Sequence, residues 1–253
     1  DGVANSSGYV GRCLMDHLQG QAASILPHPV FPFRGPPTTS GIDSFRDGAF
    51  RSSHSAFRMS VGNDGWGFVE GPYSTLVNLV RSGEAPLFGT ALRDALRHRL
   101  SRQFRVSYST ETLPDRENRV TLSEQFDAMG LPKPQINFRP SEYQLAAFAR
   151  GREVIERIFT ALGATETKFN PDPHAYSSAN HIIGTCRMGT DPAKSVVDSH
   201  GCCHDHPNLF LAGCALFPTA GTANPTLTAI AVMLRGLPKI EKALGEALSP
   251  APV

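Results

Sequence analysis

The sequence has little that would favour a nucleic-acid or membrane partner. Its 24 Lys and Arg residues nearly balance its 23 Asp and Glu residues, so the formal net charge is only +1 and no basic excess favours nucleic acid. It lacks a run of about 18 apolar residues, so we expect no transmembrane helix. The first residues, 1 to 11, lack the basic start and apolar block of a signal peptide. What remains is a globular protein with 40% hydrophobic residues, ample for a core.

Cysteine is also scarce. The five cysteines are odd in number and lack C-x-x-C spacing, which argues against a disulfide framework and leaves a periplasmic and a cytoplasmic location both open. The segment His200–His206 reads H-G-C-C-H-D-H and offers thiols and imidazoles, the usual ligands of zinc. Adjacent cysteines cannot easily both bind one ion. We therefore interpret this segment as a polar loop and keep a metal site as the minor alternative.

The first 80 residues are rich in Gly, Pro and Ser. Pro27–Pro37 cannot be helical, because its prolines lack amide donors and restrict their neighbours. We expect Pro27–Pro37 to be loop and edge structure, and a strand near Ala56–Val61. A helix is predicted for Glu84–Arg102, where Leu recurs every four residues.

The middle of the chain alternates apolar and polar residues in short segments. Phe104–Thr110, Arg119–Leu122 and Gln135–Phe138 are predicted as strands joined by short connections, which indicates an antiparallel sheet. A long amphipathic helix is expected after Ser141, and Gly163 is its stop signal.

The C-terminal part predicts a strand, a loop and a helix. Asn208–Ala212 is a short apolar run typical of a buried strand. Asn224 is a good helix N-cap, and Pro225 suits the first helical position. A helix start offers free N–H groups and positive potential to whatever lies in front of it. Within this last helix, Gly236–Pro238 predicts a kink or a break.

These motifs resemble a known family. The segments H-I-I-G-T-C-R-M-G from His181, N-L-F-L-A-G from Asn208 and G-T-A-N-P-T-L-T from Gly221 resemble the C-terminal signature of the glucose-methanol-choline (GMC) oxidoreductases, which are flavoproteins. They are most similar to two sugar-oxidising branches: the catalytic subunits of bacterial FAD-dependent sugar and polyol dehydrogenases, and pyranose oxidase. Residues 2–17, G-V-A-N-S-S-G-Y-V-G-R-C-L-M-D-H, resemble a segment from well inside the full-length enzymes.

The resemblance implies a mixed fold, α+β with an α/β part. It suggests an antiparallel-sheet substrate domain over 1–174, with part of the interdomain connection at 1–20. Residues 175–253 would be the last strand-helix portion of a Rossmann-like FAD domain. The family's N-terminal half, with its G-x-G-x-x-G loop, is not in this sequence, so we expect the chain to match about the C-terminal half of such an enzyme.

The resemblance also assigns site residues. His181 matches the family's catalytic histidine, a base for the substrate hydroxyl proton, while Asn224 matches its partner and would orient that hydroxyl. FAD contacts are implied for Gly213, Cys214, Asn224, Pro225 and Thr226. Many members carry an acidic residue near Gly213, and this chain does not, so that contact does not carry over. Without the resemblance, His181 would be interpreted as a structural histidine and 208–235 as ordinary strand-helix packing.

The predicted function is therefore oxidation of a CH–OH group of a sugar or polyol, with hydride passing to the flavin N5. The expected partners are that substrate, the missing N-terminal half, as part of the same chain or a separate one, and an electron-acceptor subunit. Two alternatives are a non-catalytic binding or metal-binding module on the same scaffold, and a fragment that is inactive without the missing half.

Overall fold

The computed structural model describes residues 2–36, 38–62, 71–171 and 175–248. The chain divides into two compact units, each made of separate stretches of sequence. Unit 1 comprises Asp1–His17, Glu111–Ser141 and Ser178–Val253, and unit 2 comprises Leu18–Thr110 and Glu142–Ser177. The expected division at 174/175 therefore falls close to the last of these boundaries, but unit 1 also takes in two earlier stretches.

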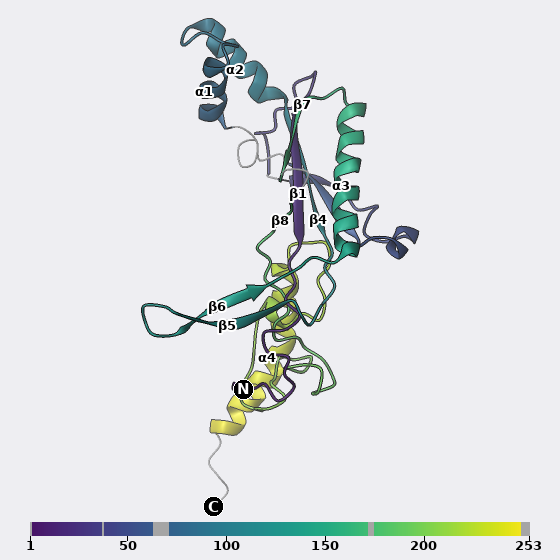
Figure 1. The fold of residues 1–253 in the computed structure, drawn as a ribbon, viewed down its shortest axis with the longest axis vertical. Coiled ribbons are helices and arrows are strands. Elements are labelled where there is room, and N and C mark those ends of the chain that lie inside the picture. Colours follow the sequence, from purple (N-terminus) through teal and green to yellow (C-terminus); the bar gives the residue numbers. More distant parts are fainter. Residues whose placement is uncertain (1, 37, 63–70, 172–174, 249–253) are drawn as a thin grey trace, which may run out of the picture. The chain divides into compact units, whose positions relative to one another are not determined.

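Unit 2 is built on an antiparallel sheet with the strand order β2-β3-β4-β1-β7, and a short strand β8 pairs with β1 (Figure 1). The antiparallel pairing and the α+β character of the fold are confirmed, but the predicted strands are divided between two sheets: 104–110 lies in this one, whereas 119–122 and 135–137 lie in a separate two-stranded sheet. The strands are β1 (Leu18–Ile25), β2 (Thr38–Ile42), β3 (Phe57–Gly62), β4 (Gln103–Thr110), β7 (Thr165–Asn170) and β8 (Ser177–Ser178).

Strand β1 lies inside the sheet, between β4 and β7. No strand was predicted at this position, whereas the prediction of loop structure for Pro27–Pro37 is consistent with the absence of helix and strand from its described residues. The β1 sequence, LQGQAASI, alternates buried and half-buried positions, but small side chains replace the large apolar ones that mark a buried strand. Gly20 is small because the Tyr108 ring of β4 lies where a side chain would be, about 2.5 Å from a Cβ built at position 20.

The core of unit 2 lies between the sheet and α3 (Glu142–Ala161), which runs along one face of the sheet (Figure 1). Tyr108 reaches across this interface, and its hydroxyl donates to the carbonyl of Phe148 at 2.8 Å. Gly151 of α3 lets the Tyr108 ring approach the helix, because a Cβ there would be 2.5 Å from the ring. The predicted helix is confirmed, and Gly163 after its end has φ +64°, as a C-terminal glycine should.

Between β3 and β4 the chain forms a helical pair, α1 (Pro72–Arg81) and α2 (Thr90–Arg102), with a small core of its own around Leu79 and Leu92 (Figure 1). The predicted helix over 84–102 starts late, at Thr90, after Gly89 with φ +95°. A short 3-10 turn, η1 (Ala49–Ser52), precedes β3.

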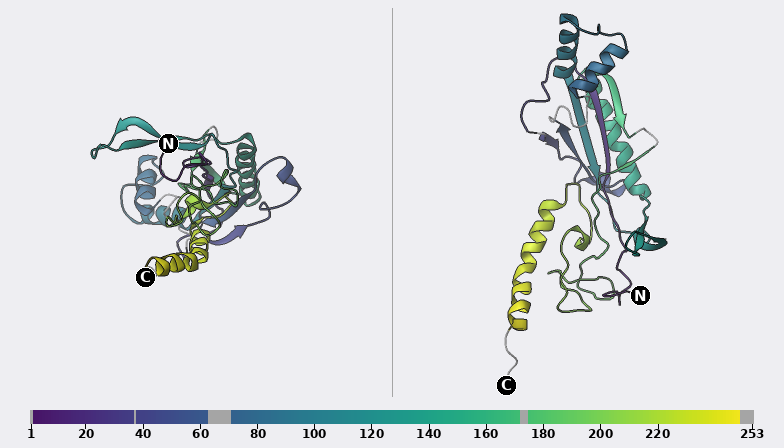
Figure 2. Two further views of the ribbon diagram at one scale, coloured as in Figure 1. Left: turned by 90° about the horizontal axis from the view of Figure 1, so that it is seen from below. Right: turned by 90° about the vertical axis from the view of Figure 1, so that its left-hand side faces the viewer.

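Unit 1 contains less regular structure. Its hairpin, β5 (Arg119–Phe126) and β6 (Pro132–Asn137), is confirmed with longer strands than predicted. The apolar run 208–212 was predicted as a strand, but Phe210 forms only an isolated bridge with Cys202. Long loops instead run beside α4 (Figure 2), and their side chains form two buried clusters. A strand needs a neighbour along its length, and here the neighbouring segments are turns.

The last helix, α4, spans Thr226–Leu248 and continues through Pro238. Of the predicted kink or break at Gly236–Pro238, the break is therefore wrong. Gly236 has a packing role, because a Cβ there would lie 2.6 Å from the carbonyl oxygen of His200. The described part of the chain contains no helix long and apolar enough to cross a membrane. All five cysteines are free thiols.

Candidate active site

The segment around His181 is joined to the end of the N-terminal stretch of unit 1 by a short ladder of backbone hydrogen bonds. Met15 donates to the carbonyl of Ile183 at 2.8 Å, and Ile183 donates back to Met15 at 3.0 Å. Both side chains are fully buried. The ladder places residues 16 and 17 next to His181, and a further bond from the amide of Ala179 to the carbonyl of His17, 3.0 Å long, extends the pairing.

Gly184 makes this close approach sterically feasible. Its φ is +85°, and a Cβ would lie 2.0 Å from the carbonyl oxygen of Cys13. Such a contact cannot be relieved by rotating a side chain, because the clashing atom belongs to the backbone. The G-T step in the His181 motif is thus a structural requirement of the site.

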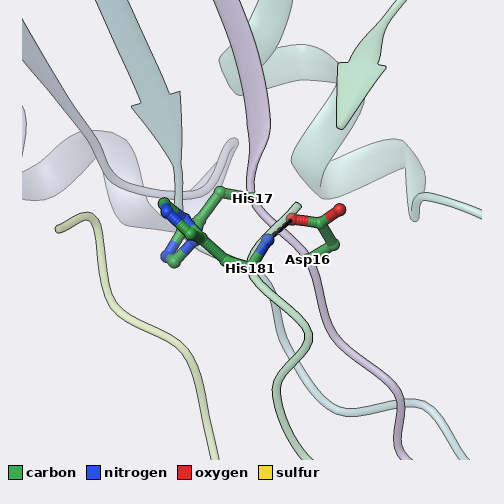
Figure 3. Close-up of side chains that lie close together, drawn as sticks. All are labelled: Asp16, His17 and His181. Atoms are coloured by element: carbon green, nitrogen blue, oxygen red, sulfur yellow. Dashed lines mark hydrogen bonds between the residues drawn. The ribbon is translucent and has the colours of Figure 1, made fainter. Parts of the chain in front are cut away.

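Asp16 holds the turn that carries His181. One carboxylate oxygen accepts the backbone amide of His181 at 3.0 Å (Figure 3). The other accepts the hydroxyl of Ser178. The Ser178 hydroxyl oxygen in turn accepts the amide of Asn180 at 2.9 Å. Asn180 has φ +58°, a left-handed conformation that this network stabilises. Asp16 is only 6% exposed. A buried carboxylate needs hydrogen-bond donors in place of water, and these groups supply them.

His17 contacts the ring of His181 directly. The two Nδ1 atoms are 2.9 Å apart, and the rings meet edge to face with centroids 5.0 Å apart (Figure 3). The other nitrogen of His17, Nε2, lies 2.9 Å from the carbonyl oxygen of Gly221. His17 is 1% exposed, whereas His181 is half-buried.

The pKa of His17 is lowered. Burial is the largest cause, and the neighbouring His181 adds to it; the Gly221 carbonyl and Asp16 act in the opposite direction without cancelling it. Near neutral pH, His17 is therefore an uncharged imidazole.

The structure brings the loop before Asn224 to this cluster through Gly221, but among the hydrogen bonds of the described residues none joins Asn224 to His181. Asn224 is exposed. The predicted cap is shifted by one residue: α4 starts at Thr226, and the carbonyl of Pro225 accepts the amide of Ala229 at 2.9 Å. Pro225 is buried, whereas Thr226 is exposed like Asn224.

Gly213 and Cys214 are connected to the same region. The carbonyl of Cys214, in the short 3-10 turn η2 (Cys214–Leu216), accepts the amide of Gly184 at 3.1 Å. Gly213 has φ +98°, and no atom lies within 4 Å of the position a Cβ would take. The site is thus open at Gly213, where a flat group could approach the backbone.

The cysteine–histidine loop at 200–206 was considered as a zinc site, as the minor alternative to a polar loop. Cys202 and Cys203 are buried, and the Nε2 of His204 contacts the hydroxyl of Ser195 at 2.9 Å. Within the described ranges, the side chains that do converge as candidate metal ligands are Asp16, His17 and His181, with ligand atoms within 4.8 Å of one another. Asp16 and His17 already use their polar atoms in the hydrogen bonds above.

Sequence reasoning missed Asp16 and His17. Both lie in the segment 2–17 that resembles the family, but no role was attached to them. One signal was present: two ionisable residues interrupt the apolar run C-L-M and L at 13–18. Buried ionisable pairs cluster at functional sites, so this interruption was a reason to consider them.

Comparison with known proteins identifies the family. Residues 114–232 match the sequence model of the family described as GMC oxidoreductase. The chain is also 36% identical over 235 residues to the fructose dehydrogenase large subunit of Gluconobacter japonicus, an alignment that covers 92% of this chain and 41% of that protein. The chain belongs to the GMC oxidoreductases. The resemblance found in the sequence is therefore confirmed.

Both predicted branches of the GMC oxidoreductases are represented. The chain is 30% identical over 139 residues to pyranose 2-oxidase of Tricholoma matsutake, which covers 51% of this chain and 25% of that one. The fold of this chain is similar to that of a formate oxidase of Aspergillus oryzae RIB40, solved in a study of FAD modification, with a TM-score of 0.61 and 15% identity. The match covers 94% of this chain and 48% of the formate oxidase chain. The chain thus spans less than half of each of these GMC proteins.

Proposed function

We propose that this chain is the part of an FAD-dependent oxidoreductase that binds a sugar or polyol and removes the proton from its hydroxyl group. The observation that carries the proposal is the half-buried imidazole of His181, held by Asp16 through its backbone and by His17 through its ring. An imidazole held in place in this way is suited to accept a hydroxyl proton, because histidine is the side chain most often used as a general base.

Asn224 is proposed to orient the substrate. Its exposed amide can donate to the substrate oxygen, and it cannot act as a base at neutral pH. The hydrogen bond that His17 Nε2 donates to the Gly221 carbonyl fixes the loop that leads to Asn224, which supports a site that uses both His181 and Asn224. The proton would pass from the hydroxyl oxygen to a ring nitrogen of His181, leaving the alkoxide held by the amide of Asn224.

The residues assigned to the cofactor fit a flat anionic group. Gly213 leaves open space beside its backbone. Residues 224–226 precede or begin the 23-residue helix α4, whose first amides favour negative charge. Bound FAD would supply the hydride acceptor, its N5. Gly213, Cys214, Asn224, Pro225 and Thr226 would hold it from one side only.

Two further proposals concern the organisation of the enzyme. We assign the substrate-binding role to 1–174 and the FAD-domain role to 175–253. We also propose that the rest of the enzyme, in the same or a separate chain, covers α4. In support, α4 exposes a stripe of large apolar side chains at helical spacing, which isolated soluble proteins rarely leave uncovered; its members are Leu227, Ile230, Leu234 and Leu237. The name of the Gluconobacter relative, a large subunit, supports an additional electron-acceptor subunit.

The test is stopped-flow flavin reduction in the complete enzyme with a saturating sugar or polyol. His181→Ala should slow reduction by roughly 10²–10⁴-fold, the usual contribution of a positioned base. Asn224→Ala should slow it less, because only an orienting hydrogen bond is removed. His28→Ala, a change at an exposed loop histidine, is the matched control. Reduction at the wild-type rate in His181→Ala would refute the proposal.

The metal-binding alternative has one observation in its favour, the convergence of Asp16, His17 and His181. It requires the His17 ring to give up one of its two present contacts, with the Gly221 carbonyl or with His181. Titration of the metal-free protein with Zn²⁺ separates the two functions: one tightly bound ion, lost in His181→Ala, would favour the metal-binding module.

A further inference from the structure

We propose that His17 is a positioning residue that fixes the tautomer of His181, so that the proton of His181 sits on Nδ1 and its Nε2 is the basic atom. The catalytic consequence rests on the proposed function, whereas the tautomer itself does not. The inference follows from four atoms in a row: the Gly221 oxygen, the two nitrogens of His17, and the Nδ1 of His181.

The first atom of the row, the Gly221 carbonyl oxygen, can only accept a hydrogen bond. A backbone carbonyl oxygen has no proton to give, so in the 2.9 Å contact with Gly221 the Nε2 of His17 must be the donor. His17 therefore carries a proton on Nε2. Because His17 is 1% exposed, water does not compete for this bond.

The next step concerns the second nitrogen of His17. The ring is 1% exposed, and burial disfavours a charged imidazole, so the ring is neutral and its only proton is the one on Nε2. The charged or titratable groups that face it are His181 and Asp16, and the Asp16 carboxylate is engaged by the His181 amide and Ser178. The Nδ1 of His17 is consequently a bare acceptor.

The last step assigns the proton of His181. Its Nδ1 lies 2.9 Å from the bare Nδ1 of His17. Two lone pairs at that distance would repel each other, so Nδ1 of His181 must be the donor. In the neutral ring, Nε2 is then unprotonated. Since Nδ1 is occupied by the buried His17, Nε2 is the nitrogen left for a substrate.

Without His17, the two neutral tautomers of His181 would interconvert freely. An imidazole with its proton on Nε2 presents an N–H group to the substrate oxygen and cannot take its proton. His17 thus acts in two ways: it orients the ring and it determines which nitrogen is basic. In acid–base sites generally, the hydrogen bond made by one nitrogen of a histidine determines which of its two nitrogens is basic.

The primary experiment reads the proton position directly. The complete protein is labelled with ¹⁵N in its histidine rings only, and ring spectra are recorded near pH 8, where protonated and bare nitrogens resonate in separate regions. His181→Ala assigns the signals. We expect His181 to carry its proton on Nδ1 in the wild type. A wild-type signal with the proton on Nε2 would overturn the inference.

Two variants of His17 provide the comparison. His17→Gln keeps an N–H for Gly221 and an oxygen that can accept from His181, so the Nδ1–H tautomer should persist. His17→Leu offers neither, so His181 should shift toward the Nε2–H form. An unchanged His181 tautomer in a folded His17→Leu protein would contradict the inference. If His17→Leu does not fold, the wild-type and His17→Gln spectra still decide it.

Flavin reduction then separates the inference from the proposed function. His17→Leu should lower the rate roughly tenfold or more, below the 10²–10⁴-fold contribution of the complete base, with little change in substrate affinity, and His17→Gln should restore most of it. If the tautomer is as expected but His181→Ala reduces flavin normally, the proposed function fails alone. If His181→Ala is slow but the tautomer is Nε2–H, the inference fails alone.

Discussion

Single residues in the site show how one buried group sets the state of another. His17 bridges a backbone carbonyl and a second imidazole, and both contacts are 2.9 Å long. Neither contact needs a charge on His17, and burial disfavours one. The neutral form of His17 is therefore part of the folded structure, which makes the stability of the fold depend on pH.

The sign of this dependence follows from the lowered pKa. In the unfolded chain His17 has its ordinary pKa of 6.5, and in the folded chain the pKa is lower because the ring is buried. The stabilising contribution is fully present above pH 6.5 and is lost as the pH falls through the folded pKa, because only the unfolded chain readily takes up the proton.

We predict that His17→Gln, which cannot titrate, flattens this part of the pH dependence. Thermal unfolding of the wild type and the variant would be compared from pH 8 to pH 5. The difference in melting temperature should be largest at pH 8 and should shrink toward pH 5. A constant difference across this range would contradict a lowered pKa for His17.

At the scale of elements, α4 depends on two glycines with different surroundings. Gly236 is buried, and a Cβ there would meet the carbonyl oxygen of His200 at 2.6 Å; Gly245 is exposed, and nothing lies within 4 Å of its Cβ position. The first glycine allows α4 to pack against the loop at 200, whereas the second only weakens the helix.

We predict opposite effects for the same substitution at the two positions. Gly236→Ala should lower the free energy of unfolding by about 1–3 kcal/mol, the usual cost of overpacking. Gly245→Ala should raise it by up to about 1 kcal/mol, because alanine favours helix. Urea unfolding of both variants measures the difference. Equal effects would show that α4 does not pack against His200.

At the scale of the whole molecule, the chain corresponds to only part of its relatives: it spans 41% of the Gluconobacter fructose dehydrogenase large subunit. The G-x-G-x-x-G loop expected for a dinucleotide is not among these 253 residues, and the residues assigned to FAD would contact it from one side. Much of the binding free energy for the cofactor would therefore come from elsewhere.

We predict that the 253-residue chain alone retains little flavin. After incubation with FAD and desalting, its absorbance spectrum should report far less than one flavin per chain, whereas the complete enzyme should keep its flavin through the same step. Stoichiometric retention by the chain alone would mean that its own residues suffice for binding.

The sequence by itself determined the local features. The helix after Ser141, the strands β3 to β6 and the last helix follow from apolar periodicity and capping signals, which depend on neighbouring residues only. The family followed from motifs around His181 and Asn224, since these contain several residues in a fixed order. The roles proposed for the two residues rest on that motif match.

Tertiary structure decided what depends on distant partners. Strand β1 escaped prediction because its small residues make sense only against the Tyr108 ring, 88 positions after Gly20 in the chain. The run 208–212 has strand-like composition but lacks a strand to pair with. His17 and His181 are 164 residues apart, and only the Met15–Ile183 ladder makes them neighbours. Contacts of this kind arise from chain packing, which local sequence patterns do not encode.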